Sequence, residues 1–267
     1  MKQKDVLMKV RRTVKLGWRP QVPDIRDRMY RFTPELDLSA LPSVVDLRTQ
    51  CPPVYDQGEL GSCTANAIAG AFEYEMLQQQ LKDFTPSRLM IYFNERAMEG
   101  TTDQDSGAEI RDGIKSIATL GVCPESEWPY DISKFTVKPS DQCYTDARKD
   151  LLKQYQPVTQ DLLHLKSCLA QGRPFVFGIS VYDSMMSDAV AQSGVVPMPD
   201  PGKDTLEGGH AIMCVGYDDA REVFIIRNSW GTGWGDAGYF YLPYAYVTDA
   251  DLASDFWTLQ LVETLNQ

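Results

Sequence analysis

The sequence predicts an α+β protein, because helical patterns fill its first half and strand patterns its second. Apolar residues recur near the 3.6-residue helical period over 63–80, 86–99, 107–120 and 160–171. After these come β-rich runs bounded by Gly, Asp and Pro: RPFVFGISV, HAIMCVGYD, EVFIIRNSW, GYFYLPY and, near the end, DFWTLQLV. A helical portion followed by a strand-rich portion is typical of α+β folds. The crevice between two such halves is a usual place for a substrate.

Size and composition fit one large domain or two small ones. The chain has 267 residues, of which 43% are hydrophobic and 24% charged. No stretch of about 18 apolar residues occurs, so no membrane span is expected. The N-terminus is basic but lacks the apolar run of a secretory signal. We therefore expect a cytoplasmic protein or one exported by a non-classical route.

Charge divides the chain into a basic leader and an acidic body. Residues 1–32 hold ten Lys/Arg and three Asp/Glu, a net charge of +7, and the remainder carries −18. Residues 1–39 are interrupted by prolines and show little apolar periodicity, so we separate them from a body over 40–267. Opposite charges favour a leader that lies across an acidic cleft as an inhibitory, propeptide-like strap; a solvated tail is the alternative. The acidic body argues against nucleic acid as the main ligand.

The cysteines give no metal or redox motif. There are six, with no C-x-x-C pair: Cys51, Cys63, Cys123, Cys143, Cys168 and Cys214. Cys168 and Cys214 lie in apolar patterns typical of core thiols. One disulfide among Cys51, Cys123 and Cys143 is compatible with the sequence, and so is a reducing compartment. With two histidines and no clustered cysteines, metal ligands are scarce, and no metal or cofactor is expected.

Only two histidines can supply an imidazole base. His164 lies in QDLLHLKSCLAQG, an amphipathic helical pattern, and is interpreted as structural. His210 lies in GGHAIMCVGYD, where a glycine pair opens a strand. Such a strand mouth lets a substrate backbone approach closely. His210 is therefore the candidate base.

Cys63 is the candidate nucleophile. In DQGELGSCTANA, Gly58 and Gly61 predict a tight turn, and Cys63 then opens a helix. The N-terminus of a helix stabilises a thiolate, and a nearby imidazolium would lower the pKa of the thiol to roughly 3–4. Taken alone, without the flanking sequence, Cys63 is better explained as a small buried hydrophobe that caps a helix.

Three further residues complete the candidate site. Asn228 follows an apolar strand in FIIRNSWGTGWGDAGYF and could accept the second ring N–H of His210, which would fix its tautomer. Trp230 could shield that bond from water. Gln57 could donate its amide N–H to an oxyanion beside the backbone N–H of Cys63. In the alternative, Asn228 caps a turn, the tryptophan only packs, and Gln57 is a solvated loop residue.

Together these segments resemble a known family. Residues 57–65, 209–217 and 228–239 resemble the three signature blocks of papain-like cysteine peptidases, in the order Cys, His, Asn. The Cys–His separation is 147 residues, within the roughly 130–150 of that family. The Asn lies 165 residues after the Cys, which a short insertion would explain. LPSVVDLRTQ resembles the family's mature N-terminus and WPYD its Pro-Tyr turn, so the resemblance covers about residues 41–247.

The resemblance implies a two-lobed fold and an activity. A helical left lobe, mainly 55–150, and a β-barrel-like right lobe, mainly 151–267, would meet at a cleft. The activity would be that of a cysteine-type endopeptidase, which cleaves protein or peptide substrates through a thioester on Cys63. Gly107 in DSGAEI resembles the glycine-containing strip that pairs with substrate, and Gly209 and Trp230 are further candidates for substrate binding. A transglutaminase-like acyl transferase and a catalytically silent papain-fold binding protein are the alternatives.

Several positions depart from the family pattern. Thr64 stands where the family usually has Trp, and Leu60 where many members have a disulfide cysteine, so that bridge is not expected. The leader lacks the long helical propeptide signature. With GWRPQVPDIRDRMY it looks more like a bacterial, short-leader branch.

Overall fold

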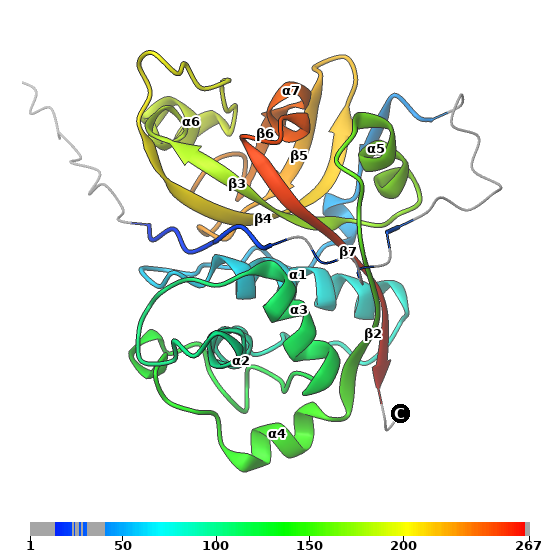
Figure 1. The fold of residues 1–267 in the computed structure, drawn as a ribbon. Helices are drawn as coiled ribbons and strands as arrows, with labels where there is room; N and C mark the ends of the chain where they lie inside the picture. Colours follow the sequence, from blue (N-terminus) through cyan, green and yellow to red (C-terminus); the bar gives the residue numbers. More distant parts are fainter. Residues whose placement is uncertain (1–13, 23, 25–26, 28, 31–40, 265–267) are drawn as a thin grey trace, which may run out of the picture.

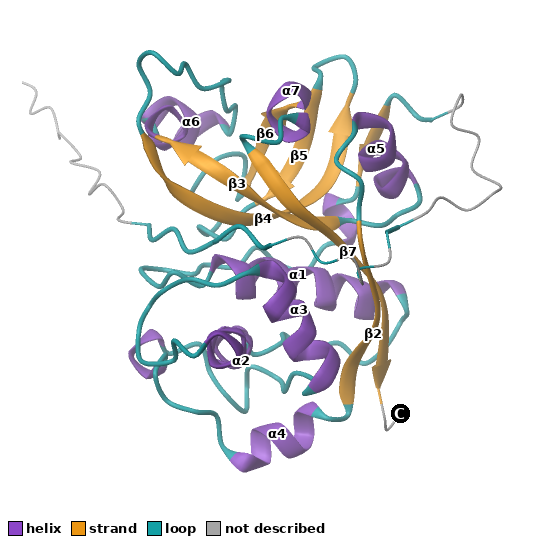
Figure 2. Ribbon diagram, viewed as in Figure 1, coloured by secondary structure: helices purple, strands orange, loops and turns teal. Residues whose placement is uncertain are grey.

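A computed structural model describes residues 14–22, 24, 27, 29–30 and 41–264 (Figure 1). The rest of the expected leader, including residues 1–13 and 31–39, lies outside the described residues. One half of the molecule is built of helices and the other of an antiparallel sheet, with short helices on its outer side (Figure 2). The predicted α+β class is confirmed. The lobe boundary near residue 150 stays a prediction.

The helical half is centred on one buried helix. Its elements are α1 (Cys63–Gln78), α2 (Arg88–Glu99), α3 (Ile110–Thr119) and α4 (Asp141–Ala147). Every residue of α1 from Cys63 to Met76 is buried, as expected for a helix covered on all sides. The Ser87 hydroxyl accepts the Met90 N–H at the start of α2, and Gly100 ends that helix in the left-handed conformation. The three helices predicted here are present, each within a few residues of its expected ends.

The sheet half contains all the strands that the sequence predicted, and two more. Its strands are β1 (Val44–Asp46), β2 (Asp150–Pro157), β3 (Phe175–Tyr182), β4 (Leu206–Asp218), β5 (Val223–Arg227), β6 (Tyr239–Pro243) and β7 (Ala253–Thr264). They pair antiparallel in the order β2-β7-β3-β4-β5-β6, and β1 adds to β4. The short helices are α5 (Leu162–Ala170), α6 (Asp188–Ser193) and α7 (Tyr244–Thr248). Periodicity did not predict β1, which is short, or β2, whose sequence DLLKQYQP is largely polar.

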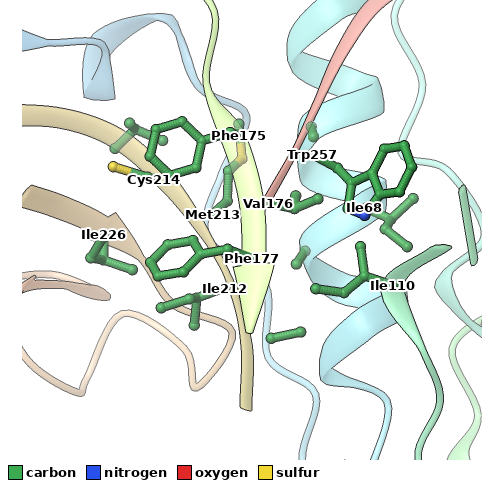
Figure 3. Close-up of a cluster of buried hydrophobic side chains, with 14 of the residues drawn as sticks. Ile68, Ile110, Phe175, Val176, Phe177, Ile212, Met213, Cys214, Ile226 and Trp257 are labelled. Atoms are coloured by element: carbon green, nitrogen blue, oxygen red, sulfur yellow. The ribbon is translucent and has the colours of Figure 1, made fainter. Parts of the chain in front are cut away.

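Both faces of the central strands are buried. Phe175 and Phe177 point to one side of β3, while Val176 points to the other, toward Ile68 of α1 and Trp257 of β7 (Figure 3). Successive residues of a strand face opposite ways, so a strand covered on both sides reads as a continuous apolar run. This packing holds α1 against the sheet.

The described residues contain no cluster of three or more His, Cys, Asp or Glu side chains that could hold a metal. Within that part of the chain, no helix is long and apolar enough to cross a membrane. All six cysteines are free. Cys123 and Cys143 share a small buried cluster with Met90, and their thiols contact each other. Cys51 packs against the main core instead.

Candidate active site

Cys63 occupies the first turn of α1 and is fully buried. Burial raises the pKa of its thiol to about 11, while the backbone N–H groups of Ala211, Gly17 and Thr64 act in the opposite direction. Ala211 is the residue after His210. The sulfur therefore lies against the strand that carries the candidate base, although 147 residues separate the two in sequence.

His210 and Asn228 are joined by a short hydrogen bond. The ring Nε2 and Asn228 Oδ1 are 2.8 Å apart, and the same oxygen accepts the Ser229 N–H at 2.8 Å. Two donors on one oxygen assign the orientation of the amide and place the ring proton on Nε2, which leaves Nδ1 with the lone pair. Burial lowers the pKa of His210 to about 4, and the bond to Asn228 opposes that shift.

Trp230 packs on the face of the imidazole. The ring centroids of His210 and Trp230 are 4.7 Å apart, and the planes are inclined by 25°. Trp234 meets Trp230 edge-on at 4.8 Å. Trp230 is almost fully buried, so the structure places it beside the His210–Asn228 bond that it was expected to shield. Its predicted contact with substrate stays a prediction.

Both polar atoms of the Gln57 side-chain amide are hydrogen-bonded. Its Oε1 accepts the Ser229 hydroxyl at 2.6 Å, which turns the amide nitrogen away from Ser229. The Nε2 group donates to the Leu60 carbonyl at 3.0 Å and to the Lys15 carbonyl at 2.9 Å. Gln57 is buried, so its interpretation as a solvated loop residue does not apply.

Tyr130 and Arg88 hold the turn that precedes Cys63. Neither of them was assigned a role in the sequence analysis. The Tyr130 hydroxyl donates to the Gln57 carbonyl at 3.0 Å and is 2.5 Å from the Ser62 hydroxyl. The Arg88 guanidinium lies 4.0 Å above the Tyr130 ring and donates to the Asp56 carbonyl. The WPYD motif was the available signal for Tyr130. Nothing in the local pattern marked Arg88.

Thr64 has a definite partner in place of the tryptophan usual in the family. Its hydroxyl donates to Glu95 Oε1 at 2.6 Å, and both residues are fully buried. Burial raises the pKa of the Glu95 carboxyl to about 8, while the Thr64 hydrogen bond and Arg96 act against that shift. When ionised, Glu95 raises the pKa of Cys63. Thr64 therefore binds an ionisable group that lies close enough to Cys63, the candidate nucleophile, to act on its pKa.

Residues 14–22 of the leader run between the helical half and the sheet half, next to α1 (Figure 1). They make backbone hydrogen bonds to Ala108 of one half and Gly209 of the other, and we call the space they occupy the leader groove. On the helical side, the Ala108 N–H donates to the Gly17 carbonyl at 2.8 Å and the Arg19 N–H to the Ala108 carbonyl at 3.1 Å. On the sheet side, the Trp18 N–H donates to the Gly209 carbonyl at 3.0 Å. Two of the predicted substrate-binding positions, Gly209 and Gly107 beside Ala108, thus border this groove.

The leader passes very close to the turn before Cys63. A Cβ atom on Gly17 would lie 1.9 Å from the Gly61 carbonyl oxygen, so only glycine fits there. A Cβ on Gly107 would lie 1.9 Å from the Gly17 carbonyl. On either side of Gly17, the leader forms ion pairs with the helical half: Lys15 pairs with Asp105, and Arg19 pairs with Glu99.

The fold and this site together define a class. A helical half and an antiparallel sheet half that meet at a cysteine, a histidine and an asparagine are the features of a papain-like cysteine protease. The family described as papain family cysteine protease matches residues 41–256. The chain belongs to the papain family.

Individual relatives agree with this assignment. Xylellain, a cysteine protease from Xylella fastidiosa, is 47% identical and superposes with a TM-score of 0.86 over 95% of this chain and 98% of its own. An uncharacterised peptidase C1-like protein of Acanthamoeba polyphaga mimivirus is 42% identical, over 92% of this chain and 86% of that protein. Cysteine proteinase 1 of Entamoeba histolytica is 28% identical, over 74% of this chain and 62% of its own length. The predicted family, fold and cysteine peptidase class are confirmed, and a bacterial short-leader branch fits xylellain.

If burial under the leader keeps the Cys63 thiol protonated, uncovering it should lower the pKa. We expect Gly17→Ala, which places a Cβ against the Gly61 carbonyl, to dislodge the leader. Alkylation of Cys63 by iodoacetamide at neutral pH should then be at least about ten times faster than in the unchanged chain, because only the thiolate reacts. The pH at which the alkylation rate of Cys63 rises should be lower in Gly17→Ala than in the unchanged chain.

Peptide mapping by mass spectrometry separates Cys63 from the other five thiols. Gly233→Ala is the matched control, because a Cβ there meets no atom within 4 Å. Identical alkylation rates in Gly17→Ala and the unchanged chain would contradict the expectation.

Proposed function

We propose that this papain-family peptidase hydrolyses peptide bonds with Cys63 as nucleophile and His210 as general base and acid. Asn228 orients the imidazole, and Gln57 donates to the oxyanion. The observation that carries this proposal is that the Ala211 N–H, one residue after His210, is directed at the Cys63 sulfur, while Asn228 Oδ1 holds His210 Nε2. These groups come from three elements and meet at the N-terminus of one helix, where negative charge is stabilised.

The reaction follows from these positions. His210 Nδ1 takes the proton from Cys63 Sγ, and the thiolate adds to the carbonyl carbon of the substrate. The electron pair of the C=O bond moves onto oxygen, which accepts hydrogen bonds from Gln57 Nε2 and the Cys63 N–H. The tetrahedral intermediate collapses, and the departing amine takes the proton from Nδ1. A thioester on Cys63 remains.

Water completes the cycle. Nδ1 takes a proton from a water molecule as its oxygen adds to the thioester carbonyl, and collapse of the second intermediate returns the proton to sulfur. The balance is one peptide bond and one water consumed, with one carboxylic acid and one amine released. Asn228 keeps the other ring proton on Nε2 throughout, so that Nδ1 faces the reaction.

We further propose that leader residues 14–22 hold the enzyme in an inhibited state. The Lys15 carbonyl accepts the Gln57 amide N–H that the oxyanion would need. The Gly17 N–H is directed at the Cys63 sulfur. The leader thus occupies polar groups of the site that a substrate would need. Burial also favours the uncharged thiol and imidazole over the reactive ion pair.

The oxyanion assignment predicts a rate effect. In the Gly17→Ala background, where the leader is already displaced, Gln57→Ala should lower kcat/KM for a fluorogenic peptide by about 10²–10³-fold. Cys63→Ala in that background should abolish cleavage and thioester formation. Gln78→Ala, at an exposed position on α1, should change neither.

Mass spectrometry of the products gives the reaction type. Two shorter peptides indicate hydrolysis, whereas a peptide joined to an added amine would indicate acyl transfer. Full cleavage by Cys63→Ala would refute the nucleophile assignment.

The ion pairs of the leader predict a salt effect. Raising NaCl from low concentration to about 0.5 M should screen the Lys15–Asp105 and Arg19–Glu99 pairs and raise the activity of the unchanged chain. The gain should be several-fold at most, because partly exposed pairs contribute about 0–1 kcal/mol each. The double variant Lys15→Ala/Arg19→Ala should be more active at low salt and respond less to added salt.

Lys153→Ala is the matched control, because it removes an exposed pair with Glu263 on the strands β2 and β7. An equal salt response in the double variant and the unchanged chain would count against leader inhibition through these charges.

A further inference from the structure

The Asp105 carboxylate binds the turn that precedes Cys63. Its two oxygens accept the Gly61 N–H, at 3.1 and 3.2 Å, and Oδ1 also accepts the Tyr92 hydroxyl. The Asp105 side chain is only 11% exposed and pairs with Lys15 of the leader as well. Lys15 departs with the leader, whereas Gly61 and Tyr92 belong to the body of the protein. The bonds to Gly61 and Tyr92 therefore persist when the leader is displaced.

Tyr92 of α2 connects Asp105 to Gly107. Its hydroxyl donates to Asp105 Oδ1 and accepts the Gly107 N–H at 3.2 Å. The Tyr92 side chain is fully buried, and the Arg96 guanidinium lies 4.0 Å from the centre of its ring. Burial raises the pKa of the Tyr92 hydroxyl, and the bond to Asp105 acts in the same direction, so the group stays protonated. One chain of hydrogen bonds thus runs from Gly61 through Asp105 and Tyr92 to Gly107.

The bond to Tyr92 also affects which backbone groups line the leader groove. The Gly107 N–H is used by Tyr92, and the next residue, Ala108, bonds to the leader with both its N–H and its carbonyl. Gly107 has a left-handed φ of 67°, a conformation that glycine adopts at little cost but does not hold by itself. By fixing the Gly107 N–H, Tyr92 sets the direction of the Ala108 groups that pair with an extended chain in the groove.

Gly61 and Gly107 both contact the same short stretch of backbone in the groove. A Cβ atom on Gly17 would lie 1.9 Å from the Gly61 carbonyl oxygen, and a Cβ on Gly107 would lie 1.9 Å from the Gly17 carbonyl oxygen. The fit leaves no room for a side chain at either position. A chain that binds here therefore depends on the separation of the loops that carry Gly61 and Gly107. Misplacement of reacting groups by about 1 Å can cost about 10²-fold in rate.

These two loops are not joined by a disulfide. All six cysteines are free, and Leu60, next to Gly61, stands where many papain-like peptidases have a disulfide cysteine. Hydrogen bonds to an ionised acceptor are roughly twice as strong as those between neutral groups. The buried contacts of Asp105 with Gly61 and Tyr92 can therefore hold the loops together in place of a covalent bond.

We propose that Asp105 and Tyr92 are a positioning pair, which sets the separation of Gly61 and Gly107 and so the fit of a substrate backbone in the leader groove. The proposal rests on the peptidase function above and assigns two positioning residues to that reaction. The pair acts on the shape of the groove and on the turn before Cys63, without taking part in proton transfer. Its loss should therefore slow the cleavage of a peptide far more than the reaction of the Cys63 thiolate with a small reagent.

Two rates measured on each full-length variant, in the Gly17→Ala background, test the proposal. Asp105→Leu removes the acceptor at similar size and should lower kcat/KM for a fluorogenic peptide by about tenfold or more. The rate of Cys63 alkylation by iodoacetamide should change by no more than about twofold, because that reagent needs only the thiolate. Tyr92→Phe should give the same pattern. The double variant should be no slower than the slower single variant, because both residues act in one chain of bonds.

The ratio of the two rates within one variant is the readout, because leader that still covers the site, or a loss of folded enzyme, lowers both rates together. Asp105→Asn keeps an oxygen that can accept the Gly61 N–H and should restore most of the lost ratio. The matched controls are Asp103→Leu, an exposed acid of the same loop, and Tyr144→Phe, which removes a hydroxyl bonded to Asn94 of α2. Both controls should leave the ratio unchanged.

A ratio that neither Asp105→Leu nor Tyr92→Phe alters would overturn the positioning pair while the peptidase function stands. Losses that multiply in the double variant would also overturn it, because the two residues would then act independently. Failure of the Gly17→Ala parent to cleave any peptide would instead overturn the proposed function.

Discussion

The site depends on a short backbone bridge between two segments far apart in sequence. The Gln57 N–H donates to the Ser229 carbonyl and the Gly231 N–H to the Tyr55 carbonyl, each at 2.9 Å. These two bonds join the turn before α1 to the loop after β5. Since Gln57 is on one side of the bridge and Asn228 on the other, backbone geometry sets the distance between Gln57, the proposed oxyanion donor, and the imidazole of His210. Side-chain flexibility therefore changes this distance little.

Buried charge beneath this bridge costs desolvation free energy, and the structure offsets it with dense pairing. Arg88 is bidentate with Glu125, at 2.7 and 2.8 Å, and stacks on Tyr55 and Tyr130. Arg227 also lies over the Tyr55 ring and donates to the Pro53 carbonyl. Such pairs add little to net stability, but the loss of one partner leaves a buried charge alone. They therefore specify one arrangement of the turn.

Sequence patterns marked the groups proposed for catalysis more clearly than the groups that hold them in place. Cys63, His210, Asn228 and Gln57 lie in motifs whose residue types and order reflect their chemistry. Ser229, Glu95 and Asp105 carry no such signal, because their roles come from contacts between elements: a hydroxyl that orients an amide, a carboxyl under a neighbouring helix, and a carboxylate that binds the backbone of another loop. The course of the leader was expected from charge alone, whereas Gly17 fits the groove by shape, which a linear pattern does not encode.

The leader is also attached outside the groove, through Asp27 and Tyr30, and this attachment affects how readily it rebinds. Beyond the groove, the Tyr30 N–H donates to the Pro157 carbonyl of β2 at 2.7 Å, and Arg111 holds Asp27. If residues 14–22 leave Cys63 while the contacts of Asp27 and Tyr30 persist, only a few residues of chain separate them from the attached part. They therefore stay close to the groove. Their local concentration is then on the order of millimolar and does not fall on dilution. A peptide substrate must compete with this local concentration of the leader. Cleavage of the leader by a second protease molecule, between the groove and the Asp27 and Tyr30 contacts, would therefore free the site permanently, whereas raising the substrate concentration would not.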